Sequence, residues 1–279
     1  MIVESLKKII AQNGRLKRND YLLNLLKEEL QAHILNFIYT TKDYQELIFT
    51  GGTCLRKVYG LDRLSVDIDL DSEQAWAGRQ ELASALSAWF RKEHRLSGVE
   101  ATVRKESVKI KLTDIGRMLP EISRDVLFVT LDISNAWTEA CRTEKNMIST
   151  TRASFIVKNY DLPTLFANKI AAFLHRNFFV GRGQGVPFKG RDVYDLFWFC
   201  QRSKKISYSL RPNFPRLFEL LKTNNRREIL DEVKEKVNSI DNEELRPQLA
   251  PYLADFQFLE SFLAIYKGEV TREMEPLFA

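Results

Sequence analysis

The sequence predicts an α+β fold, in which a small mixed sheet with flanking helices is followed by a helical C-terminal region. Runs in which apolar and polar residues alternate, as they do along half-buried strands, are confined to the chain before Asp161. From Pro163 onward, apolar residues recur only at helical spacing. The chain has 279 residues and 44% hydrophobic composition, enough for one large domain or two modest ones. We therefore expect two domains, residues 1–157 and 158–279.

Composition narrows the class of protein. The formal net charge of +5 is mildly basic and compatible with a nucleic-acid or triphosphate ligand. The three cysteines are isolated and odd in number, and the three histidines are scattered, which argues against a disulfide framework and a zinc site. The N-terminal residues carry charges inside an apolar pattern, unlike a signal peptide, and no apolar run approaches membrane-spanning length. We expect a soluble, cytoplasmic protein without membrane association.

Two helices are expected ahead of the first strand. Apolar residues recur at helical spacing over residues 2–10. A second, longer helix begins near Asn19-Asp20, where either side chain can cap it. His33 lies on or beside the apolar stripe of this helix, so we interpret that histidine as structural.

The stretch Leu47–Asp71 has the pattern of strand, tight turn, short helix, loop and strand. Its first apolar run ends at Gly51-Gly52, and two glycines let the backbone turn sharply and approach a ligand closely. Thr53 follows where a helix would begin, and the free N–H groups of a helix start favour anions such as phosphate. The turn therefore suits a phosphate-bearing ligand, although a Gly-Gly pair by itself is usually a plain turn.

Two carboxylates share one face of the next strand. Residues 65–70 alternate, so that Asp67 and Asp69 lie on one face and apolar side chains lie on the other. Neighbouring carboxylates repel each other, and a divalent cation between them removes that cost. An Asp-x-Asp pair at a strand edge is also common as solvated surface, so its chemistry depends on its surroundings.

Further strands and one helix complete the N-terminal region. An Ala- and Leu-rich helix is expected at residues 80–94, followed by a strand or hairpin within residues 100–112. Val126–Ser134 has the pattern of a strong strand, whereas the polar segment Thr143–Ser149 has that of a loop. One more short strand is expected at Phe155–Val157.

Asp132 is the one charge in the predicted strand Val126–Ser134, and strand parity places it with Phe128 and Thr130. An isolated carboxylate on a buried strand is costly unless it is paired or bound to a metal. Two interpretations stay open at this point. Asp132 is either a functional carboxylate or a residue at the exposed end of its strand.

The helix that begins at Pro163 carries two cations. Lys169 and Arg176 lie seven residues apart and therefore on one face. Such a pair is ordinary solvated surface unless that face meets a cleft, where it would bind phosphates.

The segment Phe178–Arg191 interleaves glycines with the cations Arg182, Lys189 and Arg191. It is interpreted either as a plain connector or as a mobile loop that contacts phosphates. Asp192 then begins another helix and can serve as its N-cap.

In this order and spacing, the Gly-Gly turn and the Asp-x-Asp strand resemble the polymerase-β-like nucleotidyltransferase superfamily. With the Lys-bearing helix and the Arg-Asp-x-x-Asp helix added, the chain looks like the AbiEii/MenT nucleotidyltransferase toxins of bacterial type IV toxin–antitoxin systems. The segments that carry the resemblance are FTGGTCLRKVYGLDRLSVDIDL, LPTLFANKIAAFLHR and KGRDVYDLFWF, which together span about residues 47–200. The sequence beyond Cys200 adds no family signal.

The resemblance implies a nucleotidyltransferase domain over residues 1–157 and a set of site residues. Members of the superfamily carry a third carboxylate on a later strand, and Asp132 is the best-placed candidate. Thr53 stands where the family often has serine, and its hydroxyl retains the capacity for phosphate or metal contact. The implied catalytic residues are Asp67, Asp69, Asp132, Lys169 and Asp192, the implied metal ligands are Asp67, Asp69 and Asp132, and the implied nucleotide-binding residues are Gly51, Gly52, Thr53, Lys169 and Arg176.

By the same resemblance, the activity would be Mg²⁺-dependent transfer of nucleotides from an NTP to an RNA acceptor, with two ions held by the carboxylates. The acceptor would be the tRNA 3′ end, whose modification blocks aminoacylation and translation, and a cognate antitoxin would be the protein partner. The basic net charge agrees with RNA binding, for which the candidates are Arg56, Lys57, Arg182, Lys189 and Arg191. Two alternatives stay open: a nucleotidyltransferase that modifies a protein side chain or a small molecule, as antibiotic adenylyltransferases do, and a non-catalytic nucleotide-binding partner protein.

Overall fold

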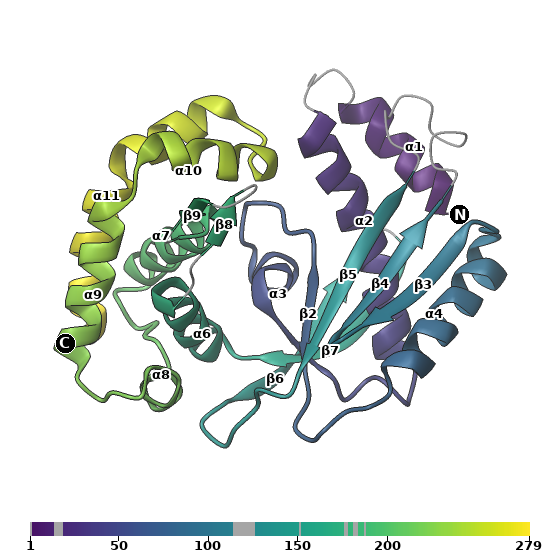
Figure 1. Ribbon diagram of the computed structural model, residues 1–279, viewed down its shortest axis with the longest axis horizontal. Coiled ribbons are helices and arrows are strands. Elements are labelled where there is room, and N and C mark those ends of the chain that lie inside the picture. The colour runs from purple at the N-terminus through teal and green to yellow at the C-terminus, as the bar shows by residue number, and fades with distance from the viewer. Residues whose placement is uncertain are drawn as a thin grey trace. The chain divides into compact units, whose positions relative to one another are not determined.

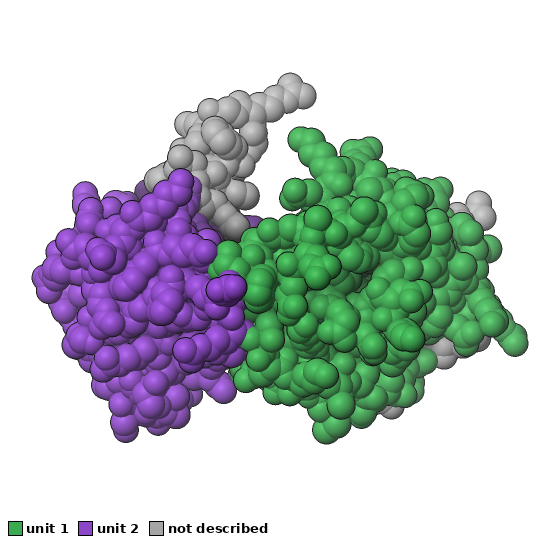
Figure 2. Space-filling view, turned by 90° about the horizontal axis from the view of Figure 1, so that it is seen from below, with its two compact units in different colours: residues 1–138, 143–160 green, residues 139–142, 161–279 purple. Residues whose placement is uncertain are grey.

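The computed structural model of the protein describes residues 2–13, 19–113, 126–150, 152–175, 178–180, 184–186 and 188–279. The chain forms two compact units, coloured separately in Figure 2. Unit 1 comprises Met1–Thr138 and Thr143–Tyr160, and unit 2 comprises Glu139–Arg142 and Asp161–Ala279. In the described ranges, no helix combines the length and the apolar character that crossing a membrane requires.

Unit 1 is built on a mixed sheet, which confirms the predicted α+β architecture (Figure 1). Its described strands are β1 (Ile48–Thr50), β2 (Ile68–Asp71), β3 (Val99–Arg104), β4 (Ser107–Leu112), β5 (Leu127–Ser134), β6 (Thr143–Ser149) and β7 (Ser154–Tyr160). They lie side by side in the order β3-β4-β5-β2-β1-β7-β6. The β2–β5 and β1–β7 pairs are parallel, and the other neighbours are antiparallel.

The helices of unit 1 cover the apolar residues of this sheet. Those that the structure describes are α1 (Ile2–Asn13), α2 (Asn19–Thr40), α3 (Gly51–Tyr59) and α4 (Arg79–His94). Leu82, Leu86 and Phe90 recur every four residues of α4 and are fully buried, as a helix face against a core requires. α4 packs on β3 and β4, and α2 packs on β5 and β7. Ile68 and Leu70 of β2 and every second residue of β5 are buried, while Asp69 and Asp132 between them are only half-buried.

β6 corrects the prediction of a loop at Thr143–Ser149. The segment pairs with β7 along its whole length, from Thr143 opposite Tyr160 to Ser149 opposite Ser154. It forms the edge of the sheet, and Ile148 is its one buried residue. An edge strand tolerates polar side chains because most of them face solvent, so its composition resembles that of a loop.

Unit 2 is mainly helical, as expected from the C-terminal pattern. Its described helices are α6 (Leu162–His175), α7 (Gly190–Lys205), α8 (Phe214–Leu221), α9 (Arg226–Ser239), α10 (Asn242–Leu249), the 3₁₀ turn η2 (Ala250–Tyr252) and α11 (Phe256–Phe278). Leu259, Phe262 and Tyr266 of α11 are fully buried, as the helical spacing of apolar residues in this region predicts for a core-facing helix. Phe256 and Phe258, in the first turn of α11, are exposed instead.

Unit 2 also contains a short hairpin that the helical pattern did not predict. β8 (Phe178–Val180) pairs antiparallel with β9 (Gln184–Val186). Phe and Val favour strands, so three such residues in a row sustain a ladder even between two helices. The hairpin falls within the Gly-rich segment that was interpreted as a connector or mobile loop.

Candidate active site

The Gly-Gly turn is shaped around the carboxylate of Asp69. Gly51 has φ +74°, in the left-handed region that glycine adopts without steric cost. A Cβ on Gly51 would lie 1.8 Å from Asp69 Oδ2, so a larger residue would displace the carboxylate. Thr50, just before the turn, pairs with Asp69 across the antiparallel β1–β2 ladder. The turn therefore brings the N-terminus of α3 directly to Asp69.

Asp69 and Asp132 are direct partners on neighbouring parallel strands. Residues paired in this way project from the same face of a sheet, on strands about 4.8 Å apart. Asp67 immediately precedes β2 and is half-buried like Asp69, whereas Ile68 between them is fully buried. The burial pattern thus sets all three carboxylates apart from the apolar core.

Asp132 lies between two paired strands and not at a free end of β5. Its register partners are Asp69 on β2 and Ser107 on β4. Ser107 Oγ donates a hydrogen bond to Asp132 Oδ1. A hydroxyl therefore satisfies one oxygen of this half-buried carboxylate, as buried polar groups require. Sequence reasoning missed Ser107, because only the register of β4 against β5 connects it with Asp132.

The chemistry of these side chains fits a hard divalent cation, because Mg²⁺ prefers carboxylate oxygens. Strand register places two of the donors, Asp69 and Asp132, next to each other. Within the described ranges, however, no three His, Cys, Asp or Glu side chains form a group that could hold a metal ion. The convergence of Asp67, Asp69 and Asp132 on bound Mg²⁺ therefore stays a prediction.

Thr53 and Gly52 support the carboxylates from inside the fold. Thr53 has no exposed surface, and its hydroxyl donates a hydrogen bond to the backbone carbonyl of Asp67. This bond ties α3 to the residue that precedes β2. The phosphate or metal contact expected of the Thr53 hydroxyl stays a prediction. A Cβ on Gly52 would lie 2.9 Å from Arg63 Nη2 and 3.0 Å from Ser65 Oγ. Arg63, which is 1% exposed and packs behind the turn, carries no signal in the sequence pattern.

Arg56 and Lys57 have a structural role that the sequence did not indicate. Arg56 forms a two-pronged ion pair with Glu28 of α2 and donates to the backbone carbonyls of Leu61 and Arg63, at 3.1 and 3.3 Å. Lys57 Nζ lies 3.6 Å from the same Glu28 carboxylate. Burial lowers the pKa of the Lys57 ammonium, and Glu28 opposes that shift. These contacts tie α3 to α2, which argues against their assignment to RNA binding.

Lys169 of α6 lies between two buried carboxylates of α7. Its Nζ is 2.7 Å from Asp195 Oδ2 and 3.6 Å from Asp192 Oδ1. The side chain of Lys169 is 14% exposed, and those of Asp192 and Asp195 are 2% and 0% exposed. Buried charges persist only when they are paired, so this cluster holds its ammonium in a fixed position. Asp195 is its closer partner and was missing from the predicted site.

Asp192 does not cap α7, contrary to the simpler of its two interpretations. The N-cap position belongs to Lys189, whose carbonyl accepts a hydrogen bond of 2.9 Å from the backbone N–H of Asp192. The carboxylate is therefore available to Lys169. Asp192 thus lies in the first turn of α7, and its carboxylate forms an ion pair with the Lys169 ammonium.

The remaining predicted contacts divide between described and undescribed residues. Lys189 and Arg191 are half-buried, and the Arg191 guanidinium lies 4.9 Å from the ring centroid of Tyr252. Arg176 and Arg182 lie outside the described residues. The predicted roles of these four cations stay predictions.

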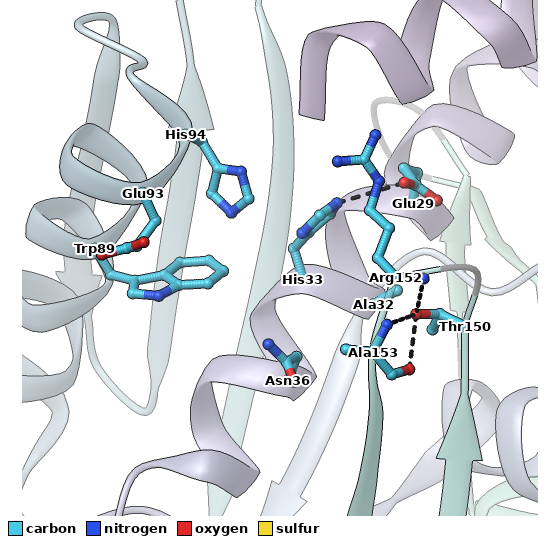
Figure 3. A pocket seen from close by; sticks show the side chains of 10 residues that line it. All are labelled: Glu29, Ala32, His33, Asn36, Trp89, Glu93, His94, Thr150, Arg152 and Ala153. Atoms are coloured by element: carbon cyan, nitrogen blue, oxygen red, sulfur yellow. Dashed lines mark hydrogen bonds and ion pairs between the residues drawn. The ribbon is translucent and has the colours of Figure 1, made fainter. Parts of the chain in front are cut away.

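A separate pocket of about 380 Å³ in unit 1 contains none of the predicted site residues (Figure 3). His33 and His94 meet there edge to face, with ring centroids 4.7 Å apart, and Glu29 lies 3.4 Å from His33. Burial, with a smaller contribution from His33, lowers the pKa of the His94 imidazole from 6.5 to about 4. Trp89 packs against His94 at 4.6 Å.

Comparison with known proteins places the chain in a family. No curated protein matches it. Among solved structures, JHP933 from Helicobacter pylori is similar, with a TM-score of 0.49, 17% identity and coverage of 91% of this chain and 94% of that chain. A second H. pylori protein, with a provisional nucleotidyltransferase assignment, has a TM-score of 0.47, 16% identity and coverage of 91% and 96%. The family described as the nucleotidyl transferase AbiEii toxin of type IV toxin–antitoxin systems matches residues 35–265, which include most of both units. The chain therefore belongs to the AbiEii family of nucleotidyl transferase toxins.

Proposed function

We propose that this nucleotidyltransferase adds nucleotides from an NTP to an RNA 3′ hydroxyl, with the tRNA 3′ end as acceptor and Mg²⁺ as cofactor. The pairing of Asp69 with Asp132 beside the Gly51 turn is the observation that carries the proposal. It puts two carboxylates next to a helix start whose backbone N–H groups favour phosphate. Membership of a toxin family implies an antitoxin partner and supports an acceptor whose modification stops growth.

In the reaction, the acceptor 3′ hydroxyl loses its proton to solvent and its oxygen attacks the α-phosphorus of the NTP. The bond from that phosphorus to the oxygen bridging the α- and β-phosphorus atoms breaks, and pyrophosphate leaves with the bonding electron pair. Asp67, Asp69 and Asp132 would hold Mg²⁺, which supplies charge neutralisation and lowers the pKa of the attacking hydroxyl. The Gly51 turn holds the Asp69 carboxylate in place, and Ser107 orients that of Asp132.

Lys169 is the cation that we assign to the leaving pyrophosphate. Its two carboxylate partners in α7 restrict the ammonium to one position, which reduces the ordering cost when an anion binds. Asp192 is thereby a positioning residue, and Asp195 shares that role.

The test is incubation of purified protein with Mg²⁺, each labelled NTP in turn, and either total RNA or purified tRNA. Label should enter RNA of tRNA size and lengthen it at the 3′ end. Asp69→Asn and Asp132→Asn should abolish incorporation. Glu106→Gln removes one negative charge from the exposed β3–β4 turn and should leave nucleotide incorporation unchanged. Expression of the wild-type chain alone should arrest growth, and expression of Asp69→Asn should not.

Labelling of a protein or a small molecule in place of RNA would contradict the acceptor assignment and leave the nucleotidyltransferase assignment in place. Incorporation into RNA that survives Asp69→Asn would contradict the assignment of the catalytic carboxylates.

A further inference from the structure

The face of the sheet that carries Asp132 continues across β4 into a basic surface. In the β4–β5 ladder, Ser107 is opposite Asp132, Lys109 is opposite Thr130 and Lys111 is opposite Phe128. Directly opposed residues of an antiparallel pair project from the same face. Lys109 and Lys111 therefore share a face with the catalytic carboxylate of Asp132.

The opposite face of these strands is closed by the core, so the basic face is the one available to a ligand. Val108, Ile110 and Leu112, which alternate with the lysines, are at most 2% exposed, and α4 packs on β4. Lys109 and Lys111 are half-buried.

β3 extends the same surface by one strand. Arg104 pairs with Ser107 and is exposed, and Thr102 pairs with Lys109 and is exposed. Glu100, opposite Lys111, is the acidic residue that β3 places on this face. We call the set Arg104, Lys109 and Lys111 the β3–β4 basic strip.

Over the ranges that the structure describes, the cations of the strip, Arg104, Lys109 and Lys111, make no ion pair. This differs from Arg56 and Lys57, which Glu28 holds. A cation without an internal carboxylate partner can bind an external anion without breaking an ion pair.

Phe128 receives cation–π contacts from two lysines. Lys109 Nζ lies 3.8 Å from the centroid of its ring, and Lys27 Nζ of α2 lies 4.6 Å from the same centroid. Each contact is favourable as a cation–π interaction, and Lys27 adds positive charge beside the strip.

We propose that the β3–β4 basic strip binds the sugar–phosphate backbone of the acceptor RNA and directs its 3′ end to Asp132. The inference rests on the proposed function and identifies the acceptor-binding surface within unit 1. Lys109 and Lys111 lie about 7 and 13 Å from Ser107 along β4, given a rise of about 3.3 Å per residue. The strip thus begins at the hydroxyl that orients Asp132 and leads away from it, as an extended acceptor strand would.

Backbone recognition of this kind is sequence-independent and depends on salt. The test is the double substitution Lys109→Glu, Lys111→Glu in the full chain, assayed with purified tRNA. Its KM for tRNA should rise at least tenfold, while kcat and the KM for NTP change less than twofold. Fluorescence anisotropy without NTP should show the loss of affinity directly. The slope of log K against log salt should decrease by about 1.4, or about 0.7 for each lost contact to a single strand.

Lys92→Glu is the matched control. Lys92 is exposed on α4, which packs against the same strands from the core side, and the charge change per substituted lysine is the same. Its KM for tRNA should equal that of the wild-type chain. Lys109→Gln, Lys111→Gln serves where the double glutamate variant does not reach the wild-type melting temperature.

Equal tRNA affinity in the wild-type chain and both double variants would overturn the inference. So would a fall in kcat or NTP affinity of the same size as the loss of tRNA affinity, because the strip would then act on the carboxylates. Unchanged tRNA affinity with loss of neutralisation by the antitoxin would identify the strip as a protein-docking surface. A wild-type chain that extends no RNA would refute the proposed function instead, and the anisotropy measurement would still decide whether the strip binds RNA.

Discussion

Gly51→Ala is expected to disable transfer through the position of Asp69. Two costs follow from the geometry. The left-handed backbone at φ +74° costs a residue with a Cβ about 1–2 kcal/mol. The new methyl group would also lie 1.8 Å from Asp69 Oδ2, and relief of such overpacking costs about 1–3 kcal/mol. The free energy of unfolding should therefore fall by about 2–5 kcal/mol, and the displaced carboxylate should reduce kcat about 100-fold.

The same helix provides the control. Gly60 follows α3 with φ +80°, and a Cβ there meets no atom within 4 Å. Gly60→Ala should therefore show only the backbone cost, about 1–2 kcal/mol, and should keep wild-type transfer. Urea unfolding measures the first quantity, and nucleotide incorporation at a temperature where both variants are folded measures the second. Equal transfer by the two alanine variants would refute the claim that the turn positions Asp69.

Three further predictions follow from individual contacts. Lys169→Ala should lower the free energy of unfolding by about 3–5 kcal/mol, because it removes the ammonium that forms ion pairs with two buried carboxylates; thermal or urea unfolding measures it. Ser107→Ala should weaken Mn²⁺ binding, followed by calorimetry without NTP, because Asp132 loses the hydroxyl that orients it. His94→Gln should flatten the acid side of the stability profile. Since the folded pKa of about 4 lies below 6.5, the stability from neutral His94 is complete above pH 6.5 and is lost as the pH falls through 4.

Each of these has a matched control. Lys205→Ala removes an exposed lysine of α7 and should leave the free energy of unfolding within about 0.5 kcal/mol of wild type. If Lys169→Ala changes the free energy of unfolding as little as Lys205→Ala does, the ion pairs of Lys169 are weak. Ser107→Thr keeps the hydroxyl and should retain Mn²⁺ affinity, so matching losses in both variants would assign the effect to packing. His175→Gln replaces an exposed histidine. If it changes the acid profile as much as His94→Gln does, burial of His94 is not the cause.

The structure changes the interpretation of Lys169 that the sequence suggested. From the sequence, Lys169 and Arg176 were two cations on one helix face, equally suited to solvent or phosphate. The structure places Lys169 against two buried carboxylates, so its removal affects stability as well as any contact with a ligand. The predicted role at pyrophosphate therefore has to be tested with NTP affinity measured on folded protein.

The sequence by itself determined the features whose cause is local. A Gly-Gly pair after a short apolar run predicts a turn, because the missing Cβ acts at that residue alone. The alternation of apolar and polar residues around Asp67 and Asp69 predicts that both carboxylates project away from the core, because successive side chains of a strand project from opposite faces. Helical spacing determined α4 and most of α11 in the same way.

Only the tertiary structure decided which distant residues meet. Ser107, Asp132 and Asp69 belong to three strands, and their alignment follows from strand register, which no periodicity within one strand specifies. Arg56 and Lys57 have the composition of a basic surface, yet Glu28 of a different helix neutralises them. The basic strip on β4 became a candidate RNA surface for the same reason, because its position beside Asp132 exists only once the strands have paired.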